Sequence, residues 1–152
     1  MTAIAFRAAV DYVPPVLRKN AKVDLLREIP LFSACTREQL AEIGRFTDEL
    51  EFPEGTTLIR EGEPGERFFV LVDGTVEVKK NGRRLRGRGG SGFFGEISLF
   101  MRYPTTATVA TTSPVRALVL TPEGFRTLLN DFPGIQSRIL LALAQRLAPE
   151  TV

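Results

Sequence analysis

The apolar residues of this chain follow a helical period near both ends and a strand-like period between about residues 48 and 120. Thr36 and Gln39 have the spacing of a capping box, in which two side chains satisfy the first N–H groups of a helix. The helix that begins there places Leu40 and Ile43 on one side and is therefore amphipathic. A shorter helical stretch from residue 23 precedes it and is stopped by Pro30.

The central part of the chain consists of short runs rich in strand-forming residues, separated by glycine and proline. The pairs Asp73-Gly74 and Asn81-Gly82 favour tight hairpin turns because they tolerate positive φ angles. Many short strands joined by such turns predict an antiparallel sandwich or roll, and we take the β-roll of the jelly-roll type as the expected fold. The predicted strands cover residues 49–52, 57–60, 67–72, 75–80, 83–88, 106–112 and 115–120.

Helical spacing returns after residue 120. Thr121 and Pro122 are favoured residues at a helix start, and the helix that they begin runs to about Asp131. A final helix follows the break at Pro133-Gly134 and carries apolar residues spaced by four. Its apolar face comprises Ile135, Ile139, Leu140, Leu141, Leu143 and Leu147. The predicted fold is therefore mostly β with flanking helices.

The length of 152 residues suits one domain, which we place at residues 22–152 with the C-terminal helices included. Residues 1–21 are predicted to be an N-terminal extension, helical around residues 4–11 and bent at Pro14-Pro15.

Composition excludes several classes of protein. Twenty basic and 18 acidic side chains give a net charge of +2, which is too balanced to indicate a nucleic-acid surface. The chain has no histidine, and its single cysteine, Cys35, cannot form an internal disulfide or a metal cluster. This cysteine usage fits the cytoplasm, and no apolar stretch is long enough to span a membrane. No nucleophile has a suitable base, so we expect a protein that is not an enzyme and has no cofactor or metal.

The segment from Gly92 to Leu99 carries the candidate chemistry. Two aromatic residues lead into Gly95 and Glu96, and the next three residues suit a short helix. Glycine permits close approach to the backbone, and free N–H groups at a helix start bind phosphates. A carboxylate accepts hydrogen bonds from sugar hydroxyls but does not bind phosphate. The segment therefore suits a small anion that carries hydroxyl groups.

Together with its neighbours, this segment resembles the cyclic nucleotide-binding domain family, typified by the catabolite activator protein and the regulatory subunits of cyclic AMP-dependent protein kinase. The resemblance runs from about residue 23 to residue 147. It is carried by the runs Leu25–Phe32, Gly55–Gly65 and Asp73–Val78, and by the phosphate-binding cassette, Phe94–Leu99 followed after four residues by Pro104–Val109.

The resemblance implies a site formed by Phe94, Gly95, Glu96, Ile97, Ser98, Thr105 and Thr106. Glu96 would accept the ribose 2′-hydroxyl, and the N–H groups of residues 95–98 would face the cyclic phosphate. Thr106 stands where a threonine contacts guanine in some members.

This chain departs from the family after the cassette proline, where an arginine that pairs with the phosphate is replaced by Thr105. Loss of a charge-assisted bond that contributes about 1.5–3 kcal/mol would weaken binding by about one to two orders of magnitude. A threonine hydroxyl would still donate one neutral hydrogen bond. Arg102 is the nearest candidate for a replacement phosphate contact, and Arg84, Arg86 and Arg88 are more remote.

Two functional hypotheses follow. In the first, the chain senses cyclic AMP or cyclic GMP and signals through its C-terminal helices. The apolar face of the last helix then serves as a lid, a homodimer interface or a protein-binding surface. In the second, Thr105 marks a degenerate module that binds no nucleotide and acts as a protein-interaction or assembly surface. Neither hypothesis gives this chain a nucleic-acid or membrane partner.

Overall fold

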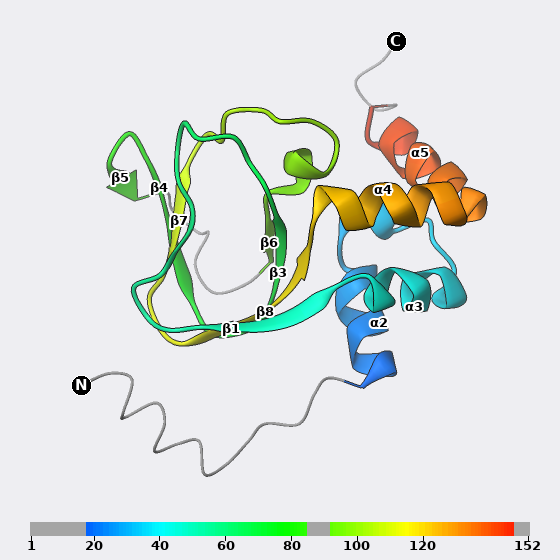
Figure 1. Ribbon diagram of the computed structural model, residues 1–152, viewed down its shortest axis with the longest axis horizontal. Helices are drawn as coiled ribbons and strands as arrows, with labels where there is room; N and C mark the ends of the chain where they lie inside the picture. Colours follow the sequence, from blue (N-terminus) through cyan, green and yellow to red (C-terminus); the bar gives the residue numbers. More distant parts are fainter. Residues whose placement is uncertain (1–17, 85–91, 148–152) are drawn as a thin grey trace.

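A computed structural model describes residues 18–84 and 92–147, and in it the helices gather at one end of a β-roll (Figure 1). The predicted extension at residues 1–21 lies almost wholly outside the described residues. The helical elements are α2 (Lys19–Arg27), η2 (Pro30–Phe32), α3 (Arg37–Arg45), η3 (Glu96–Leu99), α4 (Pro122–Asp131) and α5 (Pro133–Leu147), of which η2 and η3 are 3-10 turns. None of the helices in the described ranges has the length and apolarity needed to cross a bilayer.

The described strands form two antiparallel four-stranded sheets, which confirms the predicted β-roll with flanking helices. One sheet has the order β1-β8-β3-β6 and the other the order β2-β7-β4-β5. The strands are β1 (Asp48–Phe52), β2 (Thr57–Ile59), β3 (Phe68–Asp73), β4 (Val76–Lys80), β5 (Arg83–Arg84), β6 (Phe93–Phe94), β7 (Thr108–Thr111) and β8 (Val115–Leu120).

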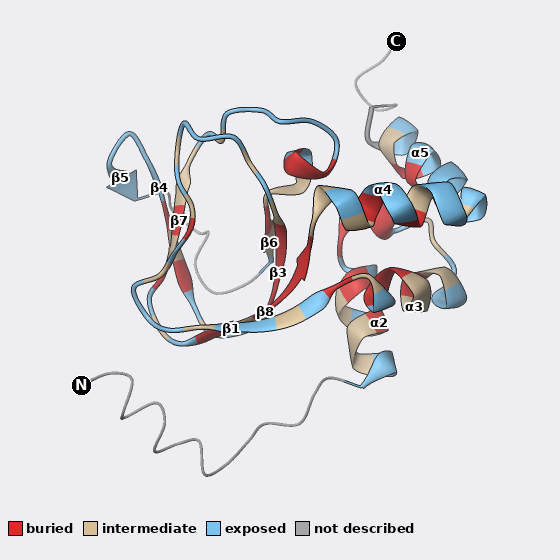
Figure 2. Cartoon of the chain, in the orientation of Figure 1, coloured by how far each residue is buried: buried red, intermediate tan, exposed pale blue. Residues whose placement is uncertain are grey.

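Strands β3 and β8 are buried on both faces, which gives the molecule two hydrophobic cores (Figure 2). Phe68 and Val70 of β3 pack into a core shared with the helices, whereas Phe69 and Leu71 point into the interior of the roll. This division follows from the two-residue period of a strand, which sends successive side chains to opposite faces. The helices are therefore anchored on the outer face of the sheet that also lines the roll.

Residues at the element ends agree with the capping predictions. Thr36 accepts a hydrogen bond from the Gln39 N–H (3.2 Å), and the Gln39 side chain accepts one from the Thr36 N–H (2.8 Å), so both halves of the capping box form. Thr121 caps α4 through the Gly124 N–H at 3.0 Å. Helix α5 includes Pro133 as its first residue, earlier than predicted, because proline's fixed φ suits that position.

Several element boundaries differ from the predictions. Helix α2 begins at Lys19 rather than residue 23, and so starts before the predicted domain boundary. Strand β7 begins at Thr108 rather than Thr106. Of the predicted strand 83–88, only the first two residues are described as β5, and the rest lies outside the described residues. Strand β6 was missed, because a two-residue strand is too short to show a period.

Candidate ligand-binding site

The predicted short helix after the two aromatic residues is present as the turn η3, and its geometry depends on glycine. Gly95 has φ +88° and lies directly before η3. A Cβ atom at this position would lie within 3.0 Å of the Arg67 carbonyl oxygen. Only glycine tolerates both the left-handed conformation and this contact. Ser98 is buried and donates its hydroxyl hydrogen to the Gly95 carbonyl at 2.6 Å, which closes the turn.

A cavity of about 450 Å³, here called the cassette cavity, lies between η3 and the facing strands. Six of the seven residues predicted from the resemblance line it: Phe94, Gly95, Glu96, Ile97, Thr105 and Thr106. One carboxylate oxygen of Glu96 is buried. Among the described residues that line this cavity, Glu96 is the only one with a charged side chain. Sequence reasoning did not single out Tyr103 or the apolar residues Ile59, Val78, Phe93, Ala107 and Val109, which complete the walls.

Thr105 is held by the protein itself. Its hydroxyl oxygen lies 2.5 Å from the Arg60 carbonyl oxygen and 3.0 Å from the Glu63 carbonyl oxygen. The single hydroxyl hydrogen is shared between these two acceptors. The Thr105 N–H also donates to the Glu63 carbonyl at 2.9 Å, and the Gly62 N–H donates to the Thr105 carbonyl at 2.8 Å. Thr105 therefore ties the cassette to the loop after β2. The one neutral hydrogen bond that we predicted for a ligand is directed to these carbonyl groups in this structure.

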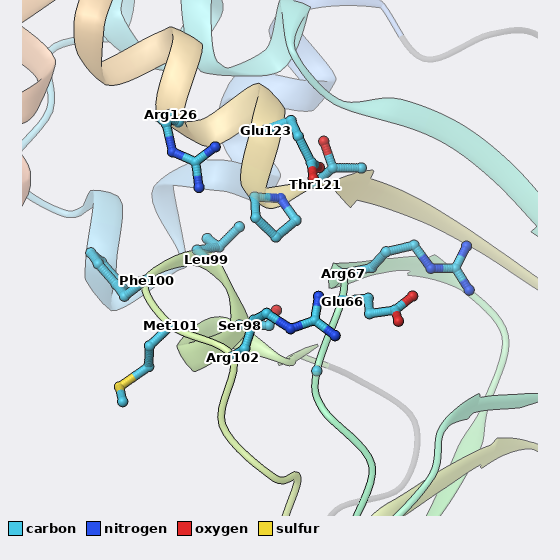
Figure 3. A pocket seen from close by; sticks show the side chains of 12 residues that line it. Glu66, Arg67, Ser98, Leu99, Phe100, Met101, Arg102, Thr121, Glu123 and Arg126 are labelled. Carbon is cyan, nitrogen blue, oxygen red and sulfur yellow. The ribbon is translucent and has the colours of Figure 1, made fainter.

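Ser98 and Arg102 do not line the cassette cavity. Both line a second cavity of about 480 Å³ between η3 and the start of α4 (Figure 3). Of the more remote arginines, Arg84 pairs with Glu77 at 3.3 Å. Arg86 and Arg88 lie outside the described residues. The predicted site residues therefore lie together at the cassette cavity, except for Ser98 and the candidate arginines.

A direct contact joins η3 to the helices. Leu99 is buried in the helix-side core. The ring of Phe100, which follows η3, meets that of Phe125 in α4 edge to face, with centroids 5.2 Å apart and an interplanar angle of 79°. This ring contact joins the segment after η3 directly to the first of the two C-terminal helices.

The described residues contain no group of three histidine, cysteine, aspartate or glutamate side chains placed to hold a metal ion. The walls of the cassette cavity combine one carboxylate, the hydroxyl groups of two threonines and a tyrosine, and apolar surfaces. Such a mixture fixes the orientation of a small polar molecule while burying its apolar part.

Comparisons with known proteins agree with this geometry. The profile of the cyclic nucleotide-binding domain family matches residues 49–132. The chain is 31% identical over 129 residues to a CRP-like cAMP-activated global transcriptional regulator from Mycobacterium tuberculosis, covering 82% of this chain and 58% of the regulator. It is 31% identical over 123 residues to a cAMP-dependent protein kinase regulatory subunit from Aspergillus niger, covering 80% of this chain and 30% of the subunit.

A solved structure shares the fold over most of the chain. The N-terminal domain of a transcriptional regulator from Streptomyces coelicolor A3(2) superposes with a TM-score of 0.76 at 34% identity, covering 84% of this chain and 95% of that domain. The relatives named here are regulatory proteins rather than enzymes, as the sequence predicted for this chain. The matched profile spans more than half of the 152 residues, and the chain belongs to the cyclic nucleotide-binding domain family.

Proposed function

We propose that this domain binds cyclic AMP or cyclic GMP in the cassette cavity and acts as a regulatory sensor. The observation that carries the proposal is the position of Glu96, which lines a cavity of about 450 Å³ at the start of η3. That volume lies within the range of about 300–1,000 Å³ typical of small-molecule sites. The M. tuberculosis and A. niger relatives are named for their dependence on cAMP, which supports a ligand of this class.

In this proposal each wall of the cassette cavity contacts one part of the nucleotide. The Glu96 carboxylate would accept a hydrogen bond from a ribose hydroxyl, which is its role in the family. Apolar side chains of Ile59, Val78 and Val109 offer a surface for the flat base. The Thr106 hydroxyl stands at the same cavity and provides a donor or an acceptor for a base edge.

Isothermal titration calorimetry with cyclic AMP and cyclic GMP tests the proposal, with 5′-AMP as the non-cyclic control. We expect saturable one-site binding that Glu96→Gln weakens by about tenfold or more, since a hydrogen bond to a charged group contributes about 1.5–3 kcal/mol. The matched control is Glu54→Gln, an exposed acid in the turn before β2. The proposal fails if neither cyclic nucleotide produces heat or thermal stabilisation at millimolar concentration.

We also propose that occupancy is transmitted to α4 and α5 through the Phe100–Phe125 contact. A ligand shifts a conformational equilibrium only through contacts that differ between the two states, and η3 touches both the cavity and α4. Cyclic nucleotide should therefore change amide hydrogen exchange in α4 and α5. Phe100→Ala should keep the affinity and lose that change, whereas Met101→Ala, an exposed neighbour outside the ring contact, should keep both. If both variants keep the ligand-dependent change in amide hydrogen exchange, this route is excluded.

A second candidate function, assembly without a nucleotide, is favoured by the hydrogen bonds that Thr105 makes to backbone carbonyls. In this case the exposed Leu140 and Leu141 of α5 (61% and 44% accessible) would pack against a second copy or another protein. Sedimentation of the wild type and of the double variant Leu140→Gln/Leu141→Gln tests self-association. A calorimetric blank together with a dimer that the variant loses would favour assembly. A monomer that binds nucleotide would exclude it.

A further inference from the structure

The second cavity, of about 480 Å³, borders the end of η3 and the segment after it, and it has no lining residue in common with the cassette cavity. It is bounded by the segment after η3, by the start of α4 and by the residues just before β3 (Figure 3). Its apolar surface comes from Leu99, Phe100, Met101 and Pro122. The volume is again that of a small-molecule site.

Two arginines from different elements face this cavity. Arg102 extends from the segment after η3, and Arg126 extends from α4 toward the same space (Figure 3). Within the described part of the chain, neither guanidinium has an ion pair or a hydrogen bond to a protein acceptor. Arginine stays protonated at all physiological pH values, so both positive charges persist.

The other charged residues of the cavity do not neutralise this pair. The Arg67 guanidinium lies over the Phe69 ring, 4.9 Å from its centroid, and extends away from Arg126 (Figure 3). Glu66 lies beside Arg67 on the side toward which Arg102 extends, and Glu123 lies at the start of α4 (Figure 3); neither forms an ion pair with Arg102 or Arg126 in the described structure. Three guanidinium groups and two carboxylates leave one net positive charge around the cavity.

We propose that this cavity binds an organic anion, a phosphate or carboxylate group on an apolar body, with Arg102 and Arg126 as the paired cations. Guanidinium groups bind such anions through charge-assisted and often bidentate hydrogen bonds. The apolar body would rest on Phe100, Met101 and Pro122, which line the same space. A bound anion would join the segment after η3 to α4. The inference does not rest on nucleotide binding in the cassette cavity, because the lining residues are different.

The test is a titration of the ¹⁵N-labelled full chain with phenyl phosphate at constant ionic strength, following the arginine Nε–Hε signals by NMR. We expect saturable shifts at Arg102 and Arg126. Inorganic phosphate should bind more weakly, and phenol should not shift these signals. Each Arg→Gln substitution at these two positions should weaken binding by about tenfold or more, as loss of a charge-assisted hydrogen bond does. Both side chains are exposed, and thermal unfolding checks that the variants keep the fold.

Arg83→Gln is the matched control, because Arg83 is an exposed arginine in β5 that lines neither cavity. It should bind phenyl phosphate like the wild type. The proposal is overturned if the double variant Arg102→Gln/Arg126→Gln keeps the wild-type affinity, or if inorganic phosphate binds as tightly as phenyl phosphate. It is also overturned if phenyl phosphate shifts the Thr106 and Ala107 amide signals of the cassette cavity instead. That outcome would not contradict the proposal that the cassette cavity binds a nucleotide.

Discussion

Replacing Gly95 with alanine should destabilise the protein through two separate effects of the added Cβ atom. The first is the left-handed conformation at φ +88°, which costs a residue with a Cβ atom about 1–2 kcal/mol. The second is the contact of that Cβ with the Arg67 carbonyl oxygen at less than 3.0 Å. Forcing an extra methyl group into a packed site costs about 1–3 kcal/mol. The sum predicts a loss of about 2–5 kcal/mol in the free energy of unfolding.

Gly62→Ala separates the two effects, because Gly62 has the same φ of +88° and has nothing within 4 Å of an added Cβ atom. It should lose only the conformational part, about 1–2 kcal/mol. Urea unfolding of both variants, followed by circular dichroism, measures the difference. Equal losses in the two variants would refute the argument that Arg67 makes this position intolerant of a side chain.

Three further predictions concern individual residues. Thr36→Ala removes half of the capping box of α3 and should lower the free energy of unfolding by about 0.5–2 kcal/mol in urea denaturation, and an unchanged midpoint would contradict the role of the cap. Thr105→Val should lower the free energy of unfolding by about 0.5–1.5 kcal/mol through loss of the hydroxyl hydrogen bond. Calorimetry should show a smaller change in nucleotide affinity for this variant than for Glu96→Gln. Burial raises the pKa of the Cys35 thiol from 9.0 to about 11, against the lowering effect of Arg138. The unfolded thiol therefore ionises first, and the free energy of unfolding should fall as the pH rises from 9 to 11. The decline should be smaller in Cys35→Ala, and equal pH profiles of the two proteins would contradict it.

Features with a local cause could be predicted from the sequence. The Thr36–Gln39 capping box and the Asn81-Gly82 turn, with φ +55° and +78°, depend on residues close together in the chain. Most strands were predicted because β-rich runs and turn residues mark them. The resemblance to a family supplied the residues of the cassette cavity, of which Glu96 and Thr106 do face the same space.

Features that depend on distant partners could not be predicted. Thr105 donates to carbonyl groups of residues 60 and 63, which are more than 40 positions away. Arg102 follows η3 closely in sequence, but spacing alone does not say on which side of the turn its side chain leaves. Strand β6 pairs with β3 over two residues only and depends on that neighbour rather than on its own period.

The turn η3 connects these observations, because its residues line both cavities and contact the helix-side core. Ser98 closes it through the Gly95 carbonyl at 2.6 Å, and Leu99 is buried, so the four residues have little freedom to move one by one. A ligand in either cavity would therefore act on the same rigid unit. Thermodynamic linkage then requires that the factor by which phenyl phosphate changes the affinity for a cyclic nucleotide equals the factor for the reverse effect. A factor above one would show that the two sites are coupled, and a factor of one would contradict the expectation that both ligands act on the same unit.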